Sequence, residues 1–416
     1  MTFLDNCLKN LCSSQGCAKL ERFLLGDQTD ENEKSSVQGF WPVRNRPGTF
    51  LAARCLDTAL GSDGLGTLED VLQRCFDQAK TEYPRYFAIR NESDVLTQAK
   101  HILESTHYGT SPFWSKLYLE EHEDVIARLL LGLVAGHPEP IRDSVVDLSR
   151  GLERRVLSLV RWLEKHRNPQ AKDWLRLSIQ AEALSSDWTI NDVATVGDRL
   201  WKVISSSNRV DAEKFFFHIL ETNTRQEMQL ACFPSTRIAA AFTLKFYEHI
   251  LKEHQTTRVT FVPRSVRVGN YASYQDVLWL KEGFPGLRSG SFVLHDRGPK
   301  LRAIDPRRLH REITDVIEGS LLLDIRGSHA YRSLQGIGKP CFFGFMAISK
   351  LERTLVGSNE STQQTVFIHQ NPFDHSFEIR DHPLTRQATG PSSHTQSLRS
   401  AIKMERRRYF QSVFLD

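Results

Sequence analysis

Four basic side chains lie where the sequence predicts the ends of strands, and they share one sign of charge. They are Arg264, Arg326, Arg332 and Lys350. Guanidinium groups bind phosphate and carboxylate through paired hydrogen bonds, so this set predicts a pocket for a small anionic or phosphorylated metabolite. Ordinary surface charge is the alternative interpretation of the same residues.

Two groups of histidine and aspartate are further candidates for chemistry. His295 and Asp296 follow a predicted strand and suit a metal ligand or an acid–base pair, because histidine titrates near neutrality. A hydrogen-bonded turn is the alternative for this pair. A second group suits a transition metal, although its aperiodic, proline-containing setting favours a surface loop: His369, Asp374, His375, Asp381 and His382.

The elements that would position these residues differ between the two halves of the chain. Residues 50–205 have apolar positions at helical spacing, most clearly over residues 145–163, and residues 125–135 are apolar enough for a buried helix. Residues 25–39 are polar and acidic, as in a loose connection. The sequence therefore predicts a mainly helical region over residues 1–205.

After residue 210, short apolar runs alternate with amphipathic helices, which predicts stacked β-α units around a largely parallel sheet. The runs cover residues 215–220, 258–262, 291–294, 320–324 and 341–345. Predicted helices over residues 235–251, 273–281 and 306–317 separate them. We expect an α/β domain over residues 206–360 and an extension over residues 361–416.

Ligands of parallel sheets bind beyond the carboxyl ends of the strands. This rule selects four stretches as the candidate site, which are residues 221–227, 264–271, 295–300 and 326–332.

In this order, these stretches resemble the damage-control phosphatase family, also called acidic-residue methyltransferase-like or domain of unknown function 89. The resemblance runs from Val43 to Gly357 and includes "VRNRPGTFLAARCLDTAL" near its start. It implies a helical N-terminal part, a Rossmann-like domain and a divalent metal.

Particular motifs carry the resemblance. "LETNTRQEMQL" resembles Asp-Asn-x-Gly-Phe-Glu, with Asn223 and Glu227 matching. "VTFVPRSVRVGNYASYQD" resembles a strand and loop with a Lys, for which Arg264 stands. The stretch from Arg326 to Arg332 resembles Lys-Gly-Asp-x-Asn-Tyr-Arg, and Lys350 falls at a phosphate-contacting Lys.

The departures from the family pattern concern acidic and amide groups. Thr222 and Ser328 stand where the family has Asp, and Ala330 stands where it has Asn. "IQAEALSSDW" has Ala183 at the Asp of Asn-Ala-Thr-Asp-Leu-Ser, and the second metal motif offers Asn270 or Tyr271. These losses remove oxygen ligands that Mg²⁺ or Mn²⁺ prefers.

The resemblance implies a divergent metal-dependent phosphatase, with Mn²⁺ or Mg²⁺ held by Glu221 and Asn223, or no metal if the site is eroded. Asn223 and Glu227 would be catalytic, and the four basic residues would hold the substrate. The alternative to these roles is structural: Glu221 would be a solvated side chain, and Glu227 would cap the following turn. A repurposed biosynthetic enzyme and a non-catalytic binding protein remain alternative functions.

Composition excludes several classes of protein. The 54 basic and 50 acidic residues give a net charge of +4 without a clustered basic face, so no nucleic-acid partner is expected. No apolar segment suits a membrane and no leader pattern is visible, and the seven scattered cysteines favour reduced thiols, so we expect a cytoplasmic protein. Gly-rich nucleotide loops and the Gly-x-Ser-x-Gly elbow are absent from the sequence.

Overall fold

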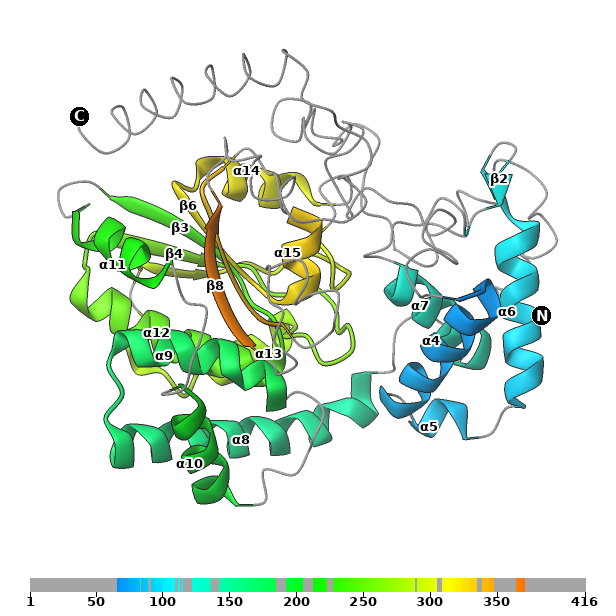
Figure 1. The fold of residues 1–416 in the computed structure, drawn as a ribbon, viewed down its shortest axis with the longest axis horizontal. Coiled ribbons are helices and arrows are strands. Elements are labelled where there is room, and N and C mark those ends of the chain that lie inside the picture. The colour runs from blue at the N-terminus through cyan, green and yellow to red at the C-terminus, as the bar shows by residue number, and fades with distance from the viewer. Residues whose placement is uncertain are drawn as a thin grey trace, which may run out of the picture.

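A computed structural model of the protein places the chain in a six-stranded sheet domain and a smaller helical lobe (Figure 1). The structure describes residues 66–82, 84–88, 91–108, 111–112, 114, 122–135, 142–184, 192–204, 212–222, 227–288, 290–304, 309–334, 339–347 and 364–370. Within these residues, no helix has the length and apolar character that crossing a membrane requires.

The helical lobe has a hydrophobic core of its own. It consists of α4 (Leu68–Glu82), α5 (Pro84–Phe87), α6 (Glu92–Ser105) and α7 (His122–Ala135), beside a short hairpin of β1 (His107–Tyr108) and β2 (Ser111–Pro112). The apolar faces of the four helices pack together, and Leu301 is the one residue of the sheet domain in this cluster as far as the structure describes it.

The central sheet has the strand order β5-β4-β3-β6-β7-β8. Its strands are β3 (Met228–Phe233), β4 (Thr257–Phe261), β5 (Phe292–Leu294), β6 (Leu322–Arg326), β7 (Cys341–Ala347) and β8 (Gln364–Gln370). The first five are parallel, and β8 pairs antiparallel with β7. The predicted α/β fold with a largely parallel sheet is confirmed.

Helices cover both faces of the sheet, as its apolar strands require. One face packs against α8 (Arg142–Arg167), α9 (Ala171–Gln180), α10 (Val193–Ile204), α11 (Glu213–Thr222), α12 (Arg237–Glu253) and α13 (Tyr274–Lys281). The short helices η5 (Ala181–Leu184) and η6 (Pro285–Arg288) lie on the same side. The other face packs against α14 (Arg311–Gly319) and α15 (Ser328–Leu334).

Two details of the organisation differ from the sequence prediction. The helices α8 to α10, which lie within the predicted mainly helical region of residues 1–205, contribute to the core of the sheet domain. Strand β8 lies beyond residue 360, so the predicted C-terminal extension supplies the edge of the sheet. Its buried side chains, among them Val366 and Phe367, explain why it pairs with β7.

One predicted strand is wrong. Residues 215–220 belong to helix α11, and the first strand of the sheet is β3 instead. The buried side chains Phe216, Ile219 and Leu220 recur at three- and four-residue spacing, which suits a helix with one apolar face. The partly exposed Phe215 and Phe217 make the same run look continuously apolar.

Gly327 fixes the junction between β6 and α15. Its φ of +96° lies in the region that favours glycine, and a Cβ there would lie 3.1 Å from both Ser235 Cβ and Tyr271 Oη. We expect Gly327→Ala to lower the free energy of unfolding by about 1–3 kcal/mol, measured by chemical denaturation.

Gly319→Ala is the matched control. A Cβ at Gly319 meets nothing closer than Gln229 Oε1 at 3.7 Å, so this change should stay within about 0.5 kcal/mol. Equal effects of the two substitutions would contradict the close approach of Gly327 to Ser235 and Tyr271.

Candidate functional site

The topological switch point of the sheet lies between β3 and β6, which are parallel neighbours whose following segments turn to opposite faces. After β3, Pro234 to Thr236 lead into α12, and Thr236 caps this helix through Ala239 N. After β6, Gly327 leads into α15. Parallel sheets bind ligands at this kind of crevice, so the segments that meet here form the candidate site.

The loop after β4 returns to this crevice and is held in a defined conformation. Arg264 N donates to Ala272 O at 2.9 Å, and Ala272 N donates to Ser235 O at 2.9 Å. Ser273 and Asp276 form a capping box at the start of α13. These bonds place Arg264 and Tyr271 together, with the Arg264 guanidinium carbon 5.0 Å from the centre of the Tyr271 ring.

Arg264 is a buried cation without a carboxylate partner among the described residues. Its exposed fraction is 0%, and its Nε and Nη1 atoms have no hydrogen-bond partner. Its Nη2 donates to the carbonyl oxygen of Arg302. Burial lowers the pKa of Arg264 to about 10, because the charges of Tyr271 and Asp124 offset only part of the desolvation. The side chain is therefore charged at neutral pH and incompletely solvated by protein groups.

Two buried hydroxyls near Arg264 also lack partners. Ser235 Oγ follows β3, Ser265 Oγ follows β4, and neither makes a hydrogen bond in the described structure. Buried polar groups are normally paired, so unpaired donors that gather at one crevice indicate a ligand or ordered water. The donors Arg264, Ser235 and Ser265 all suit an anion.

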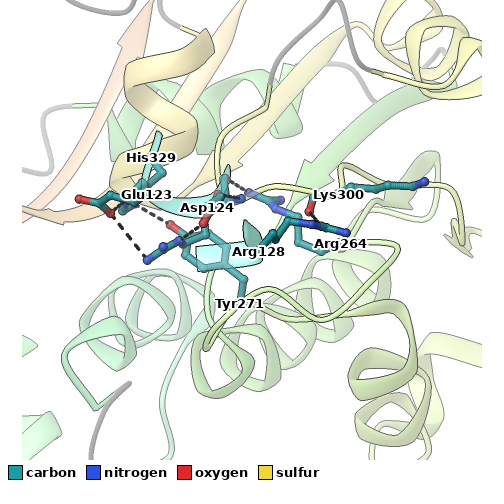
Figure 2. A network of polar contacts seen from close by, with 8 residues as sticks. Glu123, Asp124, Arg128, Arg264, Tyr271, Lys300 and His329 are labelled. Atoms are coloured by element: carbon teal, nitrogen blue, oxygen red, sulfur yellow. Dashed lines mark hydrogen bonds and ion pairs between the residues drawn. The ribbon is translucent and has the colours of Figure 1, made fainter. Parts of the chain in front are cut away.

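The helical lobe contacts this crevice through polar groups. Asp124 of α7 accepts hydrogen bonds from Arg302 N at 2.6 Å and from Arg302 Nε, while Arg128 Nη1 donates to Lys300 O at 3.2 Å (Figure 2). The Asp124 carboxylate thus neutralises Arg302. Because Asp124 is bound to Arg302, Arg264 is the one of these two arginines without a carboxylate partner among the described residues.

Glu123, His329 and Tyr271 form a second polar connection at the same crevice (Figure 2). His329 Nε2 lies 3.5 Å from Glu123 Oε2, and His329 Nδ1 lies 3.2 Å from Tyr271 Oη. Burial would raise the pKa of Glu123, but the hydrogen bond from His329 and the charge of Arg302 hold it well below its usual range. Glu123 is thus an anion at neutral pH.

Of the predicted substrate-binding residues, the structure places Arg264 at this crevice. Arg332 lies in α15, but its side chain is outside the described residues, as are Lys350 and Asn223. Arg326 is the last residue of β6 and points into the core.

Arg326 is the internal partner of a carboxylate. Its Nε and Nη2 lie 2.7 Å and 2.8 Å from the Asp324 carboxylate, and its Nη1 donates to Ser178 Oγ at 3.1 Å. A Cβ on Gly344 of β7 would lie 2.8 Å from Arg326 Nη1, so this glycine makes room for the side chain. Burial alone would lower the pKa of Arg326, but the Asp324 carboxylate raises it above its usual value.

The acidic residues predicted to bind metal or to act in catalysis lie elsewhere. Glu221 is exposed in the last turn of α11, and Glu227 immediately precedes β3, where it pairs with Arg258 at the start of β4. A strand of six residues spans about 20 Å. Glu227 therefore lies at the amino-terminal ends of the parallel strands, and Arg264 lies at their carboxyl-terminal ends.

The crevice does not fit a divalent cation. Mg²⁺ and Mn²⁺ require several oxygen ligands, whereas Arg264 and Arg302 bring positive charge and Asp124 is engaged by Arg302. The described residues contain no group of three or more His, Cys, Asp or Glu side chains that suits a metal ion. The described residues of the crevice therefore do not suit the metal that the resemblance implies.

The two histidine candidates are partnered in other ways. His295 lies near carboxylates of Asp296 at 3.9 Å and Glu312 at 3.6 Å, at the exposed end of β5. His369 of β8 packs against the rings of Phe215 and Phe342, and the other members of its predicted cluster lie outside the described residues.

The sequence prediction missed Glu123, Asp124, Arg302 and His329. Asp124 and Arg302 are 178 positions apart, so no local spacing connects them. His329 lies within the stretch that matched a family motif, and its titratable ring was a signal for it. For Glu123 and Asp124 the signal was weaker, since acidic residues in the first turn of a helix are common.

Comparison with known proteins supports the fold. No protein-family profile and no curated protein sequence matches the chain. Among solved structures, a DUF89 family protein from Pyrococcus horikoshii is similar with a TM-score of 0.54 and 12% identity, over 71% of this chain and 95% of that one. The chain therefore has the fold of that DUF89 protein, which agrees with the resemblance at the level of fold.

The internal role of Arg326 predicts a specific loss of stability. We expect Arg326→Met to lower the free energy of unfolding by about 3–5 kcal/mol, because it leaves the buried Asp324 carboxylate without its partner. Chemical denaturation measures this loss. The double variant Asp324→Asn with Arg326→Met should recover much of it, since the charge is then removed too. A double variant as unstable as Arg326→Met would contradict the ion-pair role.

Proposed function

We propose that this protein binds a small anionic metabolite, with phosphate as the favoured group, at the crevice between β3 and β6. The uncompensated Arg264 guanidinium carries the proposal. Charged hydrogen bonds to phosphate or carboxylate are short and strong, and a buried arginine without a carboxylate is the group that gains most from such a ligand.

The surroundings of Arg264 support an anion rather than a cation or a neutral ligand. Its free Nε and Nη1 donors, together with Ser235 Oγ, offer donors from the ends of two adjacent parallel strands. Gly327 lets the backbone of β6 approach the same point closely. The sheet therefore presents donors from the ends of β3 and β4 toward one crevice, beside the end of β6.

Access to Arg264 requires movement, because the side chain has no exposed surface. The segment that contains Lys300 and Arg302 covers it and is tied to α7 by Asp124 and Arg128. Leu301 alone joins the hydrophobic core of the lobe, as far as the structure describes it. Polar contacts of this kind break and form more readily than a continuous apolar interface, so the lobe with this segment acts as the cover of the site.

The family resemblance implied both an anionic substrate and a divalent metal, and the proposed function includes only the anion. The two carboxylates of the described crevice, Glu123 and Asp124, are paired with His329 and Arg302, and the unpaired groups are hydrogen-bond donors. This favours a binding protein or an enzyme with altered chemistry over metal-dependent hydrolysis. DUF89 describes the similar solved protein and supplies no substrate for this chain.

Replacement of Arg264 tests the proposal through two opposite effects. Inorganic phosphate should stabilise the wild-type protein by about 2.7 kcal/mol at one hundred times its dissociation constant. Arg264→Met should abolish this gain and should raise the stability of the ligand-free protein by about 1 kcal/mol, because an uncompensated buried charge is removed. Chemical denaturation with and without phosphate measures both effects.

Arg258→Met is the matched control, since Arg258 lies at the opposite end of the same strand β4 and is exposed. It should keep the response to phosphate. A phosphate response that survives in Arg264→Met, or that is lost in Arg258→Met, would refute the proposed site.

A further inference from the structure

The connection of Glu123, His329 and Tyr271 lies beside Arg264 and has no part in the binding step described above. Its three members come from α7, α15 and the loop after β4. The Arg264 guanidinium lies over the face of the Tyr271 ring. Tyr271 Oη packs close to Gly327, 3.1 Å from where a Cβ on that residue would lie. A hydroxyl in this position reaches the same ligand as Arg264.

The geometry determines which nitrogen of His329 titrates. Nε2 faces the Glu123 carboxylate, which only accepts hydrogen bonds, so Nε2 carries a hydrogen in both protonation states. Nδ1 faces Tyr271 Oη and is the atom that gains or loses the proton. The tautomer follows from the partners of the ring.

Protonation of Nδ1 reverses the hydrogen bond to Tyr271. When His329 is neutral, Nδ1 accepts the hydroxyl hydrogen of Tyr271, so Oη offers only lone pairs to a ligand. When His329 is protonated, Nδ1 donates to Oη, and the hydroxyl hydrogen is released toward the crevice. An anion is repelled by the first arrangement and stabilised by the second.

We propose that anion binding at this site is coupled to uptake of one proton by His329, which turns the Tyr271 hydroxyl into a donor to the ligand. This inference rests on the proposed function, and it assigns the site a preference for oxyanions at the acidic side of neutrality. One proton is taken from solvent for each anion bound, and no covalent bond changes.

The charges around the connection favour this coupling. Glu123 faces His329 from α7 and stabilises the imidazolium, while Arg302 lies 3.8 Å from Glu123 and weakens that effect. Around Tyr271 lie the charges of Glu182, Arg264, Arg302 and Asp124. Burial and the Glu182 carboxylate raise the pKa of Tyr271, so its hydroxyl keeps its hydrogen at neutral pH.

Sulfate is a suitable probe, because it remains a dianion throughout the range in which histidine titrates, unlike phosphate. Calorimetric titration of the full chain with sulfate between pH 5.5 and 8.5 should give an affinity that falls about tenfold as the pH rises. Buffers of different ionisation enthalpy should report uptake of up to about one proton per anion.

Three variants separate the coupling from other sources of pH dependence. Tyr271→Phe keeps the buried ring but has no hydroxyl to reverse, so it should bind sulfate with the weaker affinity of the wild type at high pH and without proton uptake. His329→Gln should behave alike. His295→Gln is the control, because His295 also lies beside a carboxylate but follows β5, three strand positions from β6 in the sheet, and it should keep the wild-type profile.

The possible outcomes separate this inference from the proposed function. Sulfate binding that is independent of pH, or a pH dependence that persists in Tyr271→Phe, would overturn the coupling and leave the anion site standing. Absence of sulfate binding at every pH would overturn the proposed function itself. If His329→Gln does not fold, Tyr271→Phe still decides the question.

Discussion

A guanidinium that is removed from water needs a compensating group, and the sheet domain contains two such guanidinium groups with opposite solutions. Arg326 lies inside the sheet and is compensated by Asp324, two residues earlier on the same face of β6. Arg264 lies just beyond β4 and is compensated by no carboxylate among the described residues. The charge of Arg326 is balanced within the folded protein, whereas Arg264 has unpaired donors that suit an anion.

The position of the helical lobe follows from the same charge balance. Asp124 is directed to Arg302 rather than to Arg264, and this ion pair holds the segment that covers the crevice. The hydrophobic cores of the lobe and of the sheet domain are separate clusters, and Leu301 is the sheet-domain residue that joins the lobe's cluster, as far as the structure describes it. Because polar contacts hold this cover, it can open and let a ligand from solvent reach Arg264, which is fully buried when the cover is closed.

The sequence predicted much of the sheet but little of the site. Apolar runs located β4, β5, β6 and β7, of which β6 and β7 are buried along their whole length, whereas the mixed sequence of β3 was overlooked beside the more apolar α11. Arg264 was predicted because it follows a strand. Arg326 was misjudged because it ends a strand: its two-residue spacing from Asp324 on β6 already placed both side chains on one face.

The remaining site residues depend on contacts that sequence spacing does not contain. His329 meets Glu123 and Tyr271 only because α7 and the loop after β4 both approach α15. The metal expected at Glu221 and Asn223 depended on a strand in place of α11. Residues 215–220 are helical instead. Glu227 therefore lies at the amino-terminal ends of the strands, away from Arg264 at their carboxyl-terminal ends.

A crystal structure of the protein grown with tungstate would show whether Arg264 holds the ligand anion. Tungstate is a heavy, tetrahedral mimic of phosphate whose position an anomalous difference map shows. We expect a peak within hydrogen-bond distance of Arg264 Nε and Nη1, beside Tyr271 Oη and Ser235 Oγ. Peaks confined to exposed basic residues such as Arg258, with Arg264 still covered and bound only to the Arg302 carbonyl, would contradict it.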